Sequence, residues 1–300
     1  MKLSSLLHLE SNSRQPFDPS YRFHTSWLLT PLALSVVRAT FALYIFTSTF
    51  FFLGVNSTHG DIVGIRHSFS YFSGLSLWGV GIYFGIAAIH SGSYTCTGKP
   101  LLEHWPHVLQ MLHSMLYSTV VIYPFLINTI YWIAIYRPPF IDTQDAWQTM
   151  TYHVLNSMFT FLEIILARTD PLPWTHVIWM LLILAMYLSL GYLIFATQHF
   201  LVYSFPNSEA TWDGSIAKWI FIVATATVAI FVTVNMVIWT RRWVTETLLG
   251  MTGNFADYGA NGMGSRDIEA MKAGLEAQKK NYGSYIPSAV EVYEDGLGRT

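Results

Sequence analysis

Six long apolar stretches constrain this 300-residue chain more than any other feature of its sequence. A helix rises about 1.5 Å per residue, so roughly 20 apolar residues cross the hydrocarbon core of a bilayer. In hydrocarbon a helix satisfies its own backbone hydrogen bonds. We therefore predict an all-α, polytopic integral membrane protein with short loops, whose six transmembrane helices cover residues 29–55, 71–90, 107–136, 147–167, 175–198 and 216–240.

The composition agrees with a membrane protein. Only 11% of the residues are charged, whereas soluble domains carry roughly 25%. The net charge of -2 gives no reason to expect a nucleic-acid partner, and the single cysteine, Cys96, forms no internal disulfide. We predict three parts: a retained N-terminal tail (1–28), the transmembrane domain (29–243) and a mostly disordered C-terminal tail (244–300).

The distribution of basic residues predicts an orientation. Six spans place both termini on one side of the membrane, and cytosolic loops carry the excess of lysine and arginine. We therefore expect both termini in the cytosol, with the endoplasmic reticulum or the plasma membrane as the location. The cytosolic side would hold Lys2, Arg14, Arg22, Lys99, Arg168, Arg241 and Arg242, and the other side only Arg66, Arg137 and Lys218.

The fourth predicted span carries a stripe of polar residues, in the sequence "YHVLNSMFTFLE". At about 3.6 residues per turn the stripe covers an arc of about 80° on one helix face. Such residues are costly in hydrocarbon and are functional candidates by default, although many only hydrogen-bond to neighbouring helices. Four on one face predict a shared polar interior or cavity. The stripe consists of His153, Asn156, Thr160 and Glu163.

Other spans carry smaller polar groups. Arg38 is the only basic residue well inside a span, and it either snorkels toward the cytosol or pairs with Glu163. The remaining candidates are Thr40, Tyr44 and Thr47 on one face of the first span, Gln110, His113 and Tyr117 in the third, and His199 at the end of the fifth.

Two chemistries fit these residues. A threonine and a histidine from different spans can attack an ester, because imidazole can take the hydroxyl proton. An α/β-hydrolase is excluded, because the chain has no G-x-S-x-G motif. Alternatively, His90 with His113 and His153 with His199 suit two bis-histidine haems, one in each leaflet. We predict no metal site, because the "HWPH" sequence (104–107) is typical of an interfacial loop.

Two segments carry a family resemblance: "ATFALYIFTSTFFF" in the first span and "HVLNSMFTFLE" in the fourth. They resemble the androgen-induced-gene family of multi-pass membrane proteins, over about residues 30–206. The resemblance implies hydrolysis of fatty acid esters of hydroxy fatty acids, with Thr40 as nucleophile, His153 as catalytic histidine and Glu163 at the family glutamate. The sequence departs from the animal members at Leu43 and Met150.

We therefore expect a membrane-embedded lipid ester hydrolase that needs no cofactor, with the bilayer and a long-chain lipid ester as its partners. The alternatives are a di-haem electron carrier and a non-catalytic protein that binds or transports lipid. The catalytic pair would be Thr40 and His153, Tyr44 or Asn156 would stabilise the oxyanion, and Arg38, Thr47, His113, Tyr117, Thr160, Glu163 and His199 would support the site.

Overall fold

The computed structural model describes residues 17–203 and 214–251. Regular structure in these ranges is helical apart from one isolated bridge, between Ser26 and Ala167. The long helices are α1 (Pro31–Thr58), α3 (Phe72–Thr97), α4 (His107–Ile130), α7 (His176–Gln198) and α8 (Gly214–Arg242). The shorter elements are α2 (Ile62–Ser68), η2 (Leu101–His104), η3 (Tyr131–Ile135), α5 (Thr143–Thr149), η4 (Met150–Leu155), α6 (Asn156–Leu166) and η5 (Trp243–Leu248).

The all-α prediction is confirmed for the described residues, and five helices there are long and apolar enough to cross a membrane. They coincide with five of the six predicted spans. The remaining prediction, 147–167, is helical but consists of α5, η4 and α6 in succession. Its polar stripe lowers its hydropathy, so it is not among the five. The five are Pro31–Thr58, Phe72–Thr97, His107–Ile135, His176–Gln198 and Ala217–Leu248.

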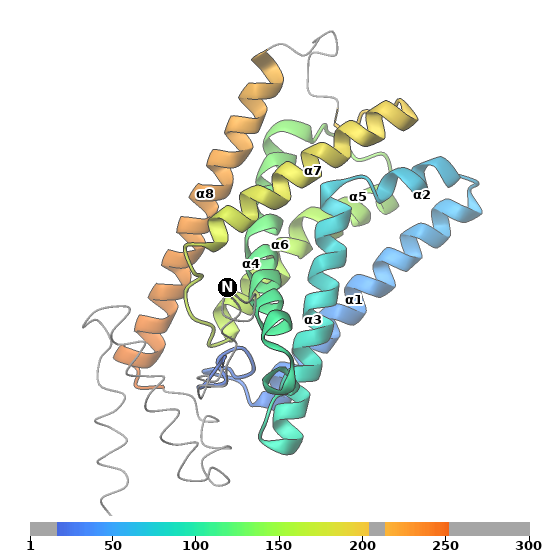
Figure 1. Ribbon diagram of the computed structural model, residues 1–300. Coiled ribbons are helices and arrows are strands. Elements are labelled where there is room, and N and C mark those ends of the chain that lie inside the picture. The colour runs from blue at the N-terminus through green and yellow to red at the C-terminus, as the bar shows by residue number, and fades with distance from the viewer. Residues whose placement is uncertain (1–16, 204–213, 252–300) are drawn as a thin grey trace, which may run out of the picture.

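Helix α4 lies in the middle of the bundle and contacts α3, α6, α7 and α8 (Figure 1). Helix α1 packs along α3 on one flank, while α8 forms the opposite flank. The hydrophobic core follows α4, where the side chains of Val120, Val121 and Ile122 are almost fully buried. The central helix therefore contacts η4 and α6, which carry the polar stripe, whereas α1 packs on α3.

The N-terminal tail predicted over 1–28 is not free where the structure describes it. Its residues 17–28 pack against the bundle, and Ser26 and Trp27 bond to the carbonyls of Leu166 and Ile165 over 2.5 and 2.7 Å. The helical domain also extends past the predicted boundary at 243, because η5 continues to Leu248. Most of both predicted tails, residues 1–16 and 252–300, lies outside the described residues.

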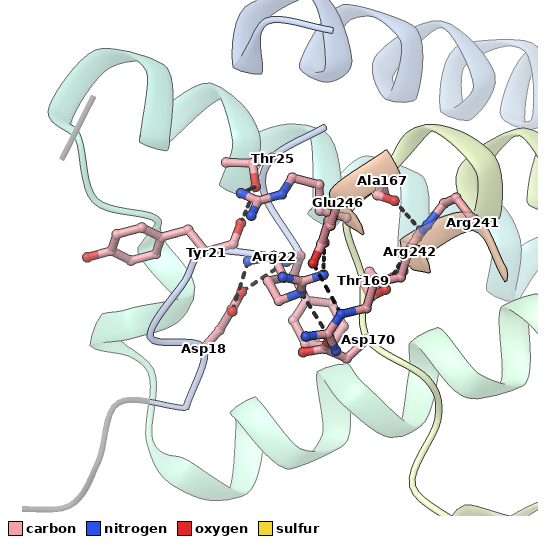
Figure 2. A network of polar contacts seen from close by, with 12 residues as sticks. Asp18, Tyr21, Arg22, Thr25, Ala167, Thr169, Asp170, Arg241, Arg242 and Glu246 are labelled. Carbon is pink, nitrogen blue, oxygen red and sulfur yellow. Dashed lines mark hydrogen bonds and ion pairs between the residues drawn. The ribbon is translucent and has the colours of Figure 1, made fainter. Parts of the chain in front are cut away.

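Charged side chains fasten this N-terminal segment to the end of α8 (Figure 2). Arg22 forms ion pairs with Asp170, over 2.9 Å, and with Glu246. Arg242 contacts the same two carboxylates over 2.6 and 3.2 Å. Arg241 is buried and donates to backbone carbonyls of residues 164, 167 and 169. The network therefore joins three parts of the chain. These are the start of the described chain, the segment that precedes α7, and the end of α8 with η5.

Asp18 makes this network sensitive to pH. Burial raises the pKa of its carboxyl from 3.8 to about 6, although the amide groups of Phe23 and Arg22 oppose the shift. Because the pKa is higher in the folded state, this carboxyl contributes stability below about pH 4, and the contribution is lost as the pH rises through 6. We expect Asp18→Asn to remove this part of the pH dependence of the free energy of unfolding.

Melting curves in mild detergent from pH 4 to 7 check this, with Asp142→Asn as a variant that removes a carboxylate elsewhere. Parallel pH profiles for wild type and Asp18→Asn would contradict the assignment.

Candidate functional site

An ion pair between Arg38 and Glu163 joins α1 to α6 inside the bundle, and the two side chains are 0% and 2% exposed. Arg38 donates to both carboxylate oxygens of Glu163. Its Nε donates to Oε2 over 3.1 Å, and its Nη2 donates to Oε1. Its Nη1 donates to the hydroxyl of Ser91 over 2.6 Å, and the hydroxyl of Tyr83 donates to the carboxylate over 2.8 Å. Of the two arrangements open to Arg38 from the sequence, the structure has the pairing.

Three buried histidines surround this ion pair. The ring of His90 contacts those of His24 and His113, with centroids 5.6 and 5.5 Å apart, and all three interact electrostatically with Arg38. Both ring nitrogens of His24 and His90, and Nδ1 of His113, have no hydrogen-bond partner among the described residues. No group of three metal-ligating side chains in those ranges is arranged to hold a metal ion.

The structure places the two histidine pairs considered for haem in different surroundings. The rings of His90 and His113 meet edge to face, with centroids 5.5 Å apart and an interplanar angle of 89°. His153 is stacked on Tyr131, while His199 is exposed after the end of α7.

A pocket of about 270 Å³ lies at the end of the bundle where α1 ends and α3 begins. His153 lies in its wall, with its ring stacked on that of Tyr131 at a centroid distance of 3.5 Å and an angle of 9°. No described residue bonds to its buried Nδ1. The lining residues are Asn56, Gly64, Ser68, Tyr71, Ser73, Tyr131, Asp145, Gln148, Thr149, Tyr152 and His153.

The π-helical element η4 determines where His153 lies. Such turns take up an extra residue in a helix and occur often at functional sites. Within η4, Thr151 contacts the hydroxyl of Tyr44 over 3.1 Å, whereas His153 stacks on Tyr131. The same Tyr44 hydroxyl accepts a hydrogen bond from Trp147 over 3.1 Å. Tyr44, a predicted oxyanion donor, therefore fastens α1 to η4 and is not among the pocket's lining residues.

The structure does not bring Thr40 to His153. Thr40 is exposed on α1, and its hydroxyl donates to the carbonyl of Val36 over 2.9 Å. Helix α1 runs antiparallel to η4 and α6, because Arg38 meets Glu163 and Tyr44 meets Thr151. Thr40 therefore lies nearer the level of Glu163, on the order of 10 Å along the axis from His153 at 1.5 Å per residue. No hydrogen bond in the described ranges joins the two side chains.

The other predicted residues divide between the interior and the surface. Asn156 and Thr160 are buried, and both bond within the bundle: Asn156 to Ser76 over 3.5 Å, and Thr160 to the backbone of its own helix. The predicted stripe is therefore an inward face, although its residues reach separate surroundings. Of the rest, Tyr117 bonds to Thr169 over 2.6 Å, His113 belongs to the histidine cluster, and Thr47 and His199 are exposed.

Sequence reasoning missed the part of the pocket that α2 and the neighbouring connector form. Helix α2 begins where the carboxylate of Asp61 accepts a hydrogen bond from the amide of Gly64 over 2.8 Å. An aspartate before a short apolar run is a helix-start signal, so this helix could have been found. The placement of Tyr131 against His153 depends on tertiary packing and left no such signal.

No family model, curated protein or solved structure matches the chain in the comparisons made with it.

Proposed function

We propose that the protein is an integral membrane hydrolase of lipid esters, with His153 as the general base. The observation that carries the proposal is the imidazole of His153 in the wall of a pocket, among side chains rich in hydroxyl and amide groups. A neutral imidazole with an unbonded ring nitrogen can accept a proton from water, and stacking on Tyr131 fixes the plane of the ring. The resemblance to the androgen-induced-gene family independently selects the same histidine.

In the proposed reaction a water molecule in the pocket attacks the ester carbonyl while His153 takes its proton. The tetrahedral oxyanion then collapses, the bond to the alkoxide breaks, and the imidazolium returns the proton to the alkoxide. The products are a fatty acid and an alcohol. Several lining residues carry hydroxyl or amide donors, and among them Tyr152 and Gln148, which neighbour His153 in the sequence, are the candidate donors to the oxyanion.

Water replaces the threonine nucleophile in this scheme because of where Thr40 lies. Its hydroxyl is bonded to its own helix and it is not in the pocket lining. We expect Thr40→Ala to retain ester turnover within about twofold, since a hydroxyl that cannot reach the base contributes no proton transfer. The measurement is release of fatty acid from a long-chain ester by the purified chain in lipid nanodiscs.

Thr47→Ala is the matched control, because it removes another exposed hydroxyl from α1. Loss of turnover in Thr40→Ala alone would restore Thr40 as the nucleophile, and absence of turnover in the wild type would refute the hydrolase.

We also infer a topology of six spans with both termini in the cytosol, in the endoplasmic reticulum or the plasma membrane. The ion pair of Arg22 with Glu246 supports an even number of crossings, because it joins the segment before α1 to the end of the last helix. Five spans would separate these two residues across the bilayer. A sixth crossing by residues 143–166 removes the conflict, and the basic residues favour the cytosolic side.

A further inference from the structure

The pocket contains an acidic side chain and no lysine or arginine. Asp145 is the only lining residue with a carboxylate, and the others are histidine, glycine and uncharged polar or aromatic residues. One oxygen of Asp145 accepts a hydrogen bond from the amide of Ile141 over 3.1 Å, and a carboxylate has further sites that accept hydrogen bonds from hydroxyl groups.

The ion-paired arginines form their ion pairs away from the pocket. Arg38 is bound to Glu163, and Arg22 and Arg242 share two carboxylates at the end of α8. Figure 1 places that end opposite α2 and α5, which contribute to the pocket. Arg66 and Arg137 are closest in sequence to lining residues, but both are exposed and neither lines the pocket.

These charges decide which lipid head groups fit. Protein sites for carboxylates and phosphates commonly use arginine or lysine, which forms charge-assisted hydrogen bonds with the anion. An anionic head group in this pocket would find no such partner and would meet the negative charge of Asp145. A head group with hydroxyls would instead find donors and acceptors throughout the lining.

We propose that the pocket selects lipid esters with an uncharged head group, and discriminates against lipids with a free carboxylate or phosphate. This inference rests on the proposed function, and it differs from the family resemblance, which implies esters that carry a free carboxylate. The pocket volume of about 270 Å³ is below the range of roughly 300–1,000 Å³ for small-molecule sites. It therefore admits the head group and the ester, while the acyl chains stay in the bilayer.

The test uses two substrates that differ in one charge: an ester of a hydroxy fatty acid with its carboxyl group free, and the same lipid with that carboxyl group methylated. For cleavage of the ester bond that both lipids share, measured as release of the fatty acid, we expect the wild-type kcat/KM to be at least about tenfold higher for the methylated lipid. In Asp145→Asn the ratio should fall severalfold toward one, because the repulsion is gone. Asp142→Asn is the matched control, since this exposed carboxylate is three residues away and outside the lining, and its ratio should stay close to that of the wild type.

Binding of the corresponding ether lipids, which cannot be hydrolysed, separates selection from catalysis. A lower Kd for the uncharged ether than for the charged one, with the difference lost in Asp145→Asn, supports the selection. This holds even if no ester is hydrolysed, because the absence of hydrolysis would refute only the hydrolase. Equal or tighter binding of the free carboxylate by the wild type overturns the inference, whatever the turnover.

Discussion

Replacing Glu163 by glutamine should lower the free energy of unfolding by about 3–5 kcal/mol, the cost of breaking a buried ion pair by removing one partner. The guanidinium of Arg38 is fully buried and donates to both carboxylate oxygens. Glutamine offers one oxygen and no charge, so Arg38 keeps its positive charge without compensation. The hydroxyl of Tyr83 donates to the same carboxylate, and in the variant it competes with Arg38 for the single amide oxygen. Equilibrium unfolding with a denaturing detergent, in mixed micelles, measures the loss.

Two further variants separate the charge from the hydrogen bonds. Ser91→Ala removes a single hydrogen-bond acceptor of Arg38, and should cost less, about 1.5–3 kcal/mol, because the charge of Glu163 remains. The double variant Arg38→Met with Glu163→Met removes both charges, and should recover much of the stability lost in Glu163→Gln, because two buried charges also cost desolvation. A double variant less stable than Glu163→Gln would show that the pair stabilises the bundle beyond cancelling its own charges.

The ion pair also shows how far the sequence could predict the interior. Helical periodicity places Thr40 and Arg38 on opposite faces of α1, but it does not determine which face turns inward. An arginine left in hydrocarbon is more costly than a threonine, and Thr40 satisfies its hydroxyl on the carbonyl of Val36. Arg38 therefore lies on the inward face of α1, and Thr40, the candidate nucleophile, is exposed.

The helices themselves were predictable because each long apolar run has one stable form in a bilayer. The pocket was less predictable, because its walls come from segments far apart in the sequence. Asn56 lies in the last turn of α1, Ser68 belongs to the unpredicted α2, and Tyr131 starts the π-helical η3. Among the predicted site residues, only His153 lies in that lining. The polar stripe indicated that its helix was a candidate, but it did not predict where the imidazole ring points.

Replacing His153 by glutamine should lower kcat for the neutral ester by about 10²–10⁴-fold, the contribution typical of a positioned general base. Glutamine is polar and similar in length, so the pocket keeps a hydrogen-bonding group but loses the group that takes the proton. Because the wild-type base must be neutral, its kcat should fall as the pH drops through the pKa of the enzyme–substrate complex. The residual rate of the glutamine variant should lack that step. Assays of fatty acid release over a pH series measure both effects.

Tyr131 provides the control that distinguishes a base from a packing residue. Tyr131→Phe keeps the ring that stacks on His153 at 3.5 Å, and should retain most of the activity, whereas Tyr131→Ala removes the stacking partner and should lower kcat while the pH step remains. The buried Nδ1 has no hydrogen-bond partner in the described residues, so the stacking on Tyr131 is a contact that orients the imidazole. A glutamine variant with wild-type kcat and an unchanged pH profile would remove His153 from the reaction and leave the pocket as a binding site.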